Sequence, residues 1–349
     1  LCLSGPKWEA DPMGQRWKHH QRIIVICHLL IRMSLITGFL MTLHNHAATP
    51  VSCIEFHPTE PIAIWNGNQY IVVHSTQSNS SKENIPVPMH RIRDVSFDPQ
   101  GHWLAVAGGS PAEQGDLVII NWNNKEPELH LQFENEWVTT VGFSSDGKQL
   151  VMGSGDSNIS VYRIQTEPFK LVQTHTFDGH AGSVMDTIFD RSGDWLISTG
   201  SDRSVKVWST RENILHRTFA HHTGVVFAAD LRPVATDQST LPFYVATASA
   251  DQTVRIWQPE IGRMVRIVRN HETDLFTVAY HPSGNWLASG GKDGTVRYID
   301  AQTDNILQEK KAHDDWIYAL AFSPDGTFMA SGDWSGKVVF QRVNEKGTD

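Results

Sequence analysis

Three residue types that can perform nucleophilic catalysis occur together in the middle of the chain. His180, Ser198 and Asp202 offer a base, a hydroxyl nucleophile and an orienting carboxylate, which are the ingredients of a hydrolase triad. A second set, with threonine in place of serine, follows at His221, Thr247 and Asp251. A catalytic set is needed once, whereas a buried histidine in each copy of a repeat needs partners for both ring nitrogens. We therefore predict a structural role for both sets and no catalytic residue in the chain.

Other signatures of enzymes and of metal sites are missing from the sequence. There is no phosphate-binding glycine loop ending in Gly-Lys-Ser/Thr, no His-Glu-x-x-His and no Gly-x-Ser-x-Gly. The 18 histidines show no metal-ligand spacing, and the three cysteines, Cys2, Cys27 and Cys53, show no paired spacing. We predict no metal, no cofactor, no small-molecule substrate and no disulfide framework.

The elements that position these residues are copies of one unit that recurs seven times. Aligned histidines at His180, His221, His271 and His313 lie 41, 50 and 42 residues apart, close to the length of a four-stranded propeller blade. Within a copy, a charged residue, Lys206 or Arg255, alternates with β-branched ones in 205–208 and 254–257, which predicts half-exposed strands. The continuously apolar segments predict buried strands, and we expect their tryptophans in the core: Trp103, Trp195 and Trp286. Pro-Ser-Gly at 282–284 and Pro-Asp-Gly at 324–326 predict hairpin turns.

The loop histidine, the turn aspartate and the strand-ending tryptophan follow one another in the order found in the WD40 repeat family, which the chain resembles over about residues 39 to 343. The resemblance implies an all-β, seven-bladed β-propeller. It also implies a structural hydrogen-bond network in each of two blades, formed by His180, Ser198, Asp202 and Trp208 and by His221, Thr247, Asp251 and Trp257. Only three strands can be drawn after His313, so we expect an N-terminal strand at 39–43 to pair with the last blade and close the ring.

The copies differ, and the differences mark places where loops can carry function. Insertions at 110–114 and 234–242 predict surface loops. The sixth copy has Ile299 where tryptophan is expected, and the seventh has Ser335 and Gln341 at the aspartate and tryptophan positions.

The N-terminal part lies outside the repeat, so we divide the chain into an extension (1–38), a propeller (39–343) and a short tail (344–349). In the extension, a basic stretch at 16–22 precedes an apolar run at 23–31. Three readings remain open: an over-extended start with initiation at Met33 or Met41, an export or anchor segment, and a genuine extra element.

Charge and the repeat together point to a protein-binding function. A net charge of −9 argues against nucleic acid as the main partner, and a membrane is not expected as a partner unless residues 16–43 form a genuine anchor. The resemblance implies that partners dock over the top of the central channel, on the residue after the first-strand valine and the residue before the turn aspartate. The first position gives Ser52, Arg93, Thr139, Met185, Val226, Phe276 and Tyr318, and the second gives Gly155, Ser201, Ala250, Lys292 and Trp334.

Trp137 and Trp316 lie on the adjacent approach loops. We expect the binding residues to be Arg93, Trp137, Met185, Phe276, Lys292, Trp316, Tyr318 and Trp334, because aromatic and arginine side chains are enriched at binding hot spots. The predicted function is a non-catalytic scaffold for other proteins or peptide segments, located in the cytoplasm. The alternative is a propeller module of a larger bacterial enzyme or redox assembly, exported or tethered through its N-terminal segment.

Overall fold

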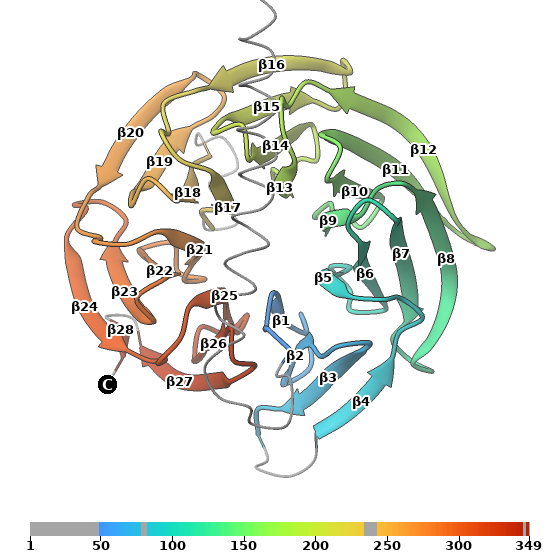
Figure 1. Ribbon diagram of the computed structural model, residues 1–349, viewed down its shortest axis with the longest axis horizontal. Helices are drawn as coiled ribbons and strands as arrows, with labels where there is room; N and C mark the ends of the chain where they lie inside the picture. Colours follow the sequence, from blue (N-terminus) through green and yellow to red (C-terminus); the bar gives the residue numbers. More distant parts are fainter. Residues whose placement is uncertain (1–48, 78–81, 234–242, 345–346, 349) are drawn as a thin grey trace, which may run out of the picture. The chain divides into compact units, whose positions relative to one another are not determined.

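The computed structural model describes residues 49–77, 82–233, 243–344 and 347–348, and all of the regular structure in these ranges is β-strand. The strands form seven four-stranded antiparallel sheets, and the strand order within each sheet follows the chain. The sheets are the blades of a β-propeller, arranged around a central channel (Figure 1). The all-β, seven-bladed fold predicted from the repeat is confirmed.

We number the blades 1 to 7 in chain order. Blade 1 has β1 (Ile54–Phe56), β2 (Ile62–Asn66), β3 (Tyr70–Ser75) and β4 (Lys82–Pro86). Blade 2 has β5 (Ile92–Phe97), β6 (Trp103–Ser110), β7 (Gln114–Asn121) and β8 (Glu126–Glu134). Blade 3 has β9 (Val138–Phe143), β10 (Gln149–Ser154), β11 (Asn158–Thr166) and β12 (Phe169–Asp178). Blade 4 has β13 (Val184–Phe189), β14 (Trp195–Gly200), β15 (Val205–Ser209) and β16 (Ile214–Phe219).

Blade 5 has β17 (Val226–Leu231), β18 (Val245–Ser249), β19 (Val254–Gln258) and β20 (Arg263–Val268). Blade 6 has β21 (Leu275–Tyr280), β22 (Trp286–Gly291), β23 (Thr295–Asp300) and β24 (Ile306–Lys311). Blade 7 has β25 (Ile317–Phe322), β26 (Phe328–Asp333), β27 (Val338–Asn344) and β28 (Gly347–Thr348). In each blade the first strand is innermost and the fourth is outermost (Figure 1).

Tight turns join the first two strands of a blade, as the Pro-x-Gly segments predict. Gly284 and Gly326 have φ values of 68° and 70°, a left-handed conformation that favours glycine. A Cβ atom on Gly284 would stand 2.2 Å from the carbonyl oxygen of Pro233 in the neighbouring blade, so the turn also needs the missing side chain. The turn of blade 6 therefore packs closely against the end of blade 5.

The hydrophobic core lies between neighbouring blades. The second strand of a blade is buried along most of its length, as in β22, where all six residues are buried. Blades 7 and 1 share such a cluster, which includes Val51, Phe56 and Ala330. The backbone N–H of Val51 also donates to the carbonyl oxygen of Asp333 over 3.0 Å. In the described part of the chain, the ring is therefore closed by side-chain packing and by this hydrogen bond.

The predicted closing strand at 39–43 lies outside the described residues, as does the whole N-terminal extension, so its three readings stay open. In the described part, β28 supplies the fourth strand of blade 7. It pairs only with Val343 and Asn344 of β27. Residues 338–342 of β27 have no described strand on the side away from β26.

Several expectations about exposure are corrected by the structure. Lys206 and Arg255 are buried, with 7% and 9% of their surface exposed, because their head groups find partners inside the sheet. Lys206 Nζ donates to Thr218 Oγ1 over 3.3 Å, and Arg255 forms an ion pair with Asp251 over 3.2 Å. Trp286 is buried as expected, but Trp103 and Trp195 are only half-buried.

The two insertions have different outcomes. Residues 110–114 form the end of a long β6–β7 hairpin in which Ser110 pairs with Gln114, and its tip is exposed as predicted. Residues 234–242 lie outside the described residues. No helix long and apolar enough to cross a membrane is found in the described ranges.

Candidate interaction surface

The histidine, serine and aspartate of blade 4 form a closed hydrogen-bond network. His180 Nδ1 lies 3.0 Å from Asp202 Oδ2, and its Nε2 lies 2.7 Å from Ser198 Oγ. Ser198 Oγ also accepts a hydrogen bond from Trp208 Nε1 over 2.8 Å. Both ring nitrogens of His180 and the hydroxyl of Ser198 are thus occupied within a buried site. The structure brings the four predicted residues together in an arrangement that leaves Ser198 no free approach to a substrate.

Blade 5 holds the same network, but the histidine is His222, and the prediction of His221 is wrong. His222 Nδ1 lies 2.7 Å from Asp251 Oδ2, and its Nε2 lies 2.9 Å from Thr247 Oγ1. Trp257 Nε1 donates to the same hydroxyl over 2.9 Å. His221 is exposed, and its ring lies 5.6 Å from that of Trp257, tilted by 56°.

The same shift of one residue affects the inner strand of blade 5. Val226 is fully buried and pairs with Ser249, as Val184 pairs with Gly200 in blade 4. The residue that follows it is Phe227, which is therefore the residue at the channel mouth. The prediction of Val226 as the blade 5 residue at the channel mouth is therefore wrong, and Phe227 occupies that position.

Blade 7 rebuilds the network with its aspartate two residues earlier than in blade 4. His313 Nδ1 lies 2.7 Å from Asp333 Oδ2, and its Nε2 lies 2.7 Å from Ser331 Oγ. Asp333 stands at the register position of Gly200. A Cβ atom on Gly200 would stand 2.5 Å from His180 Nδ1, so a carboxylate at this position reaches the histidine directly. Ser335, at the expected aspartate position, donates to Asp333 over 2.7 Å.

Blade 6 keeps only half of the network. His271 Nε2 lies 2.9 Å from Ser289 Oγ, but Nδ1 has no hydrogen-bond partner. Asp293 forms an ion pair with Arg297 over 2.7 Å instead. Burial, together with the positive charge of Arg297, lowers the pKa of His271 to about 4. The hydrogen-bond network is therefore complete in blades 4, 5 and 7 and incomplete in blade 6.

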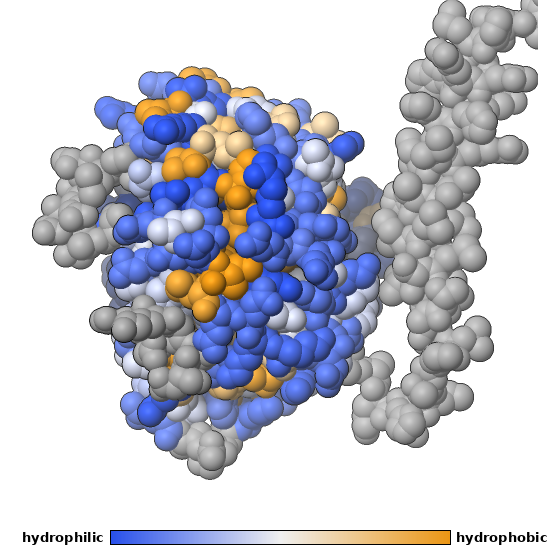
Figure 2. Space-filling model, turned by 90° about the vertical axis from the view of Figure 1, so that its left-hand side faces the viewer, coloured by the Kyte–Doolittle hydropathy of each residue, from blue (hydrophilic) through white to orange (hydrophobic). Residues whose placement is uncertain are grey.

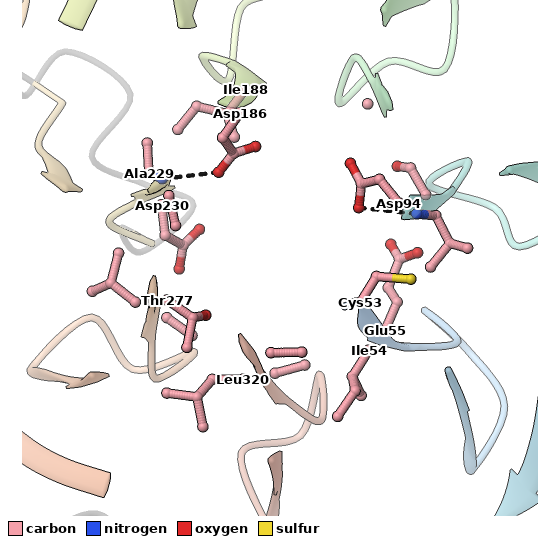
Figure 3. Close-up of a pocket in the computed structure, with 18 of the residues that line it drawn as sticks. Cys53, Ile54, Glu55, Asp94, Asp186, Ile188, Ala229, Asp230, Thr277 and Leu320 are labelled. Atoms are coloured by element: carbon pink, nitrogen blue, oxygen red, sulfur yellow. Dashed lines mark hydrogen bonds between the residues drawn. The ribbon is translucent and has the colours of Figure 1, made fainter. Parts of the chain in front are cut away.

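The seven inner strands enclose a channel with a cavity of about 720 Å³. Four carboxyl groups line it: Glu55, Asp94, Asp186 and Asp230. Figure 3 shows Glu55 and Asp94 on one side of the channel and Asp186 and Asp230 on the other. Each accepts a hydrogen bond from a backbone N–H of the next blade, at 2.9, 2.9, 2.8 and 2.6 Å in that order, from Phe97, Val141, Ala229 and Tyr280.

Burial raises the pKa of all four channel carboxyl groups. The pKa rises to about 8 for Glu55 and to about 7 for Asp186 and Asp230, and that of Asp94 is raised as well. The backbone N–H donors act in the opposite direction because they stabilise the carboxylate. These side chains connect adjacent blades. Sequence reasoning missed them, since Asp94 and Asp186 share a position that Asp230 does not, and their partners lie in another blade.

Aromatic rings from three blades meet at the mouth of the channel. Phe276 stacks on Tyr318, with ring centroids 4.7 Å apart and planes at 9°. Phe227 packs against Phe276 at 5.1 Å, and Trp334 lies 5.5 Å from Tyr318. Trp316 contacts Phe276, Tyr318 and Trp334. We call Phe227, Phe276, Trp316, Tyr318 and Trp334 the aromatic surface.

The other predicted binding residues lie around this surface. Lys292 Nζ stands over the ring of Trp316 at 5.2 Å. On the inner strand of blade 2, Arg93 stands over the ring of Trp137 at 4.8 Å. Arg93 Nε has no hydrogen-bond partner, and burial lowers the pKa of this side chain. Met185 is half-buried and lines the channel in blade 4.

The structure thus joins Phe276, Lys292, Trp316, Tyr318 and Trp334 in one cluster. It pairs Arg93 with Trp137 in a second. The sequence reasoning missed Phe227, whose place at the channel mouth follows from the pairing of the buried Val226 with Ser249. Within the described ranges, no three histidine, cysteine, aspartate or glutamate side chains are grouped so that they could hold a metal ion.

The repeat is matched by the family described as "WD domain, G-beta repeat" over residues 126–163, 171–209, 214–258, 262–300 and 305–340, more than half of the chain. The chain belongs to the WD40 repeat family. WD40 propellers are scaffolds for protein interactions, and this chain shares their fold. The five matched segments begin with the outer strand of blade 2 and end in blade 7, so blade 1 and the three inner strands of blade 2 lie outside them.

Curated WD40 proteins of several functions are similar to the chain. It is 25% identical over 241 residues to Periodic tryptophan protein 2 homolog of Caenorhabditis elegans, an alignment that covers 69% of this chain and 25% of that protein. It is 32% identical over 226 residues to eukaryotic translation initiation factor 3 subunit I of Coccidioides immitis, which covers 57% and 64% of the two chains. It is 23% identical over 205 residues to the guanine nucleotide-binding protein subunit beta of Zea mays, which covers 57% and 53%.

The chain therefore spans between a quarter and just under two thirds of the length of these relatives. The alternative reading as a module of a bacterial enzyme gains no support from them.

Proposed function

We propose that this WD40 protein is a non-catalytic scaffold that binds a protein or peptide segment on the aromatic surface at the channel mouth. The observation that carries the proposal is the continuous contact of five rings from blades 5, 6 and 7. Trp316 and Trp334 keep 38% and 39% of their surface exposed. Such rings bury much apolar area on binding while few rotatable bonds are fixed.

The chemistry of the surface favours a partner with an apolar or aromatic anchor. The rings are already packed against one another, so a side chain from the partner would lie on them. Trp316 and Trp334 supply the most exposed area, and Lys292 and Arg93 extend the surface with positive charge over two of the tryptophans. We propose a protein as the partner, and no nucleic acid, because the net charge of the chain is −9.

The test compares co-purifying proteins for two variants expressed with a tag in the native cells. In the surface variant, Trp316→Ala is combined with Trp334→Ala. In the matched control, Tyr70→Ala removes a similarly exposed aromatic side chain from β3 of blade 1, outside the aromatic surface. A partner recovered with the unmodified protein is then produced separately, and its affinity for each form is measured by calorimetry.

We expect the affinity to fall roughly 30-fold or more in the surface variant, since two hot-spot side chains each contribute about 1–2 kcal/mol. The control should bind unchanged. A partner that binds the surface variant as tightly as the unmodified protein would refute the placement of the site.

The non-catalytic part of the proposal has its own test. His180→Ala should lower the melting temperature, and the unmodified protein should show no esterase or peptidase activity. An activity that His180→Ala abolishes while the fold is retained would refute this part.

A further inference from the structure

A second surface lies on the outer wall of blades 4, 5 and 6, at the end of the blades opposite the aromatic surface. Seven large apolar side chains in the described ranges have more than about a third of their surface exposed, and four of them are here. Ile214 and Leu215 begin β16, Ile261 lies in the turn before β20, and Leu307 is the second residue of β24, with 48%, 43%, 54% and 45% exposed. All four lie at or just before the start of the outer strand, in three consecutive blades.

Contacts between neighbouring blades make these positions one continuous surface. Arg217 of β16 donates from Nε to the carbonyl oxygen of Glu260 over 3.1 Å, which places it against the turn that carries Ile261. Arg266 of β20 forms an ion pair over 3.2 Å with Asp304, three residues before Leu307. Figure 2 shows this side of the protein, where a hydrophobic band crosses a largely hydrophilic surface.

Arginine side chains surround the apolar residues. Arg211, Arg217 and Arg263 are exposed, and no ion pair is formed by any of them with a described residue. The outer strands β16 and β20 carry Arg217, Arg263 and Arg266 and no acidic residue, and the exposed acidic residues of the turns before them are Glu212 and Glu260. This excess of positive charge stands out in a chain with a net charge of −9.

Protection of sheet edges explains only part of this pattern. Charged residues on an outer strand prevent edge-to-edge aggregation, but either sign of charge would serve that purpose. The outer strand β8 of blade 2 carries Glu126, Glu128 and Glu134 instead. The charge on the outer strands is therefore segregated around the ring, and the basic part coincides with the exposed apolar residues.

We propose that this outer wall binds an amphipathic segment of a partner protein that is acidic on one face and apolar along the other. The apolar side of such a segment would cover Leu215 and Ile261, and its carboxylates would meet the guanidinium groups of Arg217 and Arg263. Nucleic acid fits less well, because phosphates would use the arginines and leave the apolar side chains exposed. We call Leu215, Ile261, Arg217 and Arg263 the wall residues.

The test uses two dye-labelled synthetic peptides of about 18 residues, made of leucine and glutamate. In the first, leucines recur at i, i+3, i+4 and i+7, so they form one helical face. In the second, the same residues are shuffled so that no face is apolar. Binding is measured by fluorescence anisotropy to the unmodified full chain and to two variants, Arg217→Glu/Arg263→Glu and Leu215→Ser/Ile261→Ser. Lys170→Glu, an exposed change on β12, is the matched control for charge.

We expect the first peptide to bind at least about tenfold more tightly than the second. Both wall variants should weaken its binding by about tenfold or more, and Lys170→Glu should leave it within about twofold. The Trp316→Ala/Trp334→Ala variant should also bind it unchanged, which separates this surface from the aromatic surface. All four wall residues are exposed, so circular dichroism should show an intact fold in both wall variants.

Four outcomes would overturn the proposal. Equal binding of both peptides, lost only in the arginine variant, would mean a general anion-binding surface. Tighter binding of a single-stranded RNA of similar length, in competition with the peptide, would assign the wall to nucleic acid. Self-association seen by sedimentation velocity and lost in both wall variants would assign it to a second copy of this chain. Absence of binding by the first peptide would reject the surface altogether.

Discussion

The adjacent histidines of blade 5 provide a sharp test of the network, because one is inside it and the other is not. His222 is 4% exposed and bonds to Asp251 and Thr247, whereas His221 is exposed. His222→Ala would remove one hydrogen bond to a carboxylate, for which we take about 2 kcal/mol, and one neutral hydrogen bond of about 1 kcal/mol. Asp251 would keep its contacts with Arg255 and Thr253, which limits the further cost of leaving it buried.

We therefore expect His222→Ala to lower the free energy of unfolding by about 3 kcal/mol and His221→Ala by less than about 0.5 kcal/mol. The corresponding fall in melting temperature is roughly 6–12 °C for His222→Ala, taking about 2–4 °C per kcal/mol for a domain of this size. Urea unfolding followed by tryptophan fluorescence measures the first quantity, and scanning calorimetry measures the second. Equal effects of the two substitutions, or a larger effect of His221→Ala, would refute the register assigned to blade 5.

The stability that His222 and Asp251 contribute depends on pH. Burial lowers the pKa of His222 below 6.5, and the hydrogen bonds from His222 and Thr253 help to hold the pKa of Asp251 well below its usual range in spite of burial. Both groups bind fewer protons in the folded state than in the unfolded state, so the stability that they contribute is lost as the pH falls. The difference between His222→Ala and the unmodified protein should be largest near pH 7 and should shrink as the pH falls below about 6.

Three further predictions concern the channel, the turns and blade 6. The pKa of Asp230 is raised to about 7, so its contribution to stability is present below about pH 4 and is lost as the pH rises through 7. In urea titrations, the unmodified protein should therefore lose about 1–2 kcal/mol of stability relative to Asp230→Asn between pH 4 and pH 7. This magnitude is discounted for solvent screening, because the group lines a channel. Gly284→Ala should lower the free energy of unfolding by about 2–3 kcal/mol in the same assay, because the added Cβ meets the backbone of Pro233. Gly193→Ala should lower it by about 1 kcal/mol, because Gly193 has a similar φ of 74° but only the Gln149 side chain nearby, at 3.3 Å. Equal losses would mean that the contact with Pro233 has no effect. His271→Ala should destabilise the protein by about 2 kcal/mol less than His222→Ala, since Nδ1 of His271 has no carboxylate partner to lose. An equal loss would show that blade 6 is held as firmly as blade 5.

The sequence predicts the blades well because each copy repeats the same local signals. The turns at Gly284 and Gly326 lie where the Pro-Ser-Gly and Pro-Asp-Gly segments predict them. Such features depend on residues close together in the chain. A repeat presents them several times, so an irregular copy can be read from its neighbours.

The register of blade 5 could not be read in this way. The chain offers two adjacent histidines, His221 and His222, and two adjacent valines, Val225 and Val226. The insertion at 234–242 lengthens this copy, so its spacing does not choose between them. Only the pairing of Val226 with Ser249 decides, and that is a contact between strands rather than a property of the sequence.

The burial of Lys206 and Arg255 was missed for a related reason. Alternation predicts which face of a strand a residue is on, but not whether that face is covered. The blades on either side cover the two faces of the inner and middle strands, so these long side chains are buried. Lys206 bonds to Thr218 of the adjacent strand, and Arg255 bonds to Asp251 of the preceding turn.

Because side chains alternate between buried and exposed positions along a strand, the family's common fold can carry a binding surface particular to this chain. Ile317 is fully buried, and Tyr318 beside it reaches the channel mouth; Asp333 is 1% exposed, and Trp334 beside it is 39% exposed. A core or network residue and a surface residue are therefore neighbours in the chain but make separate contacts. Substituting the surface residue leaves the packed position intact, so Trp334→Ala should change binding with little effect on the fold. Asp333→Ala should destabilise the fold with little effect on binding, because it leaves His313 Nδ1 buried without its partner.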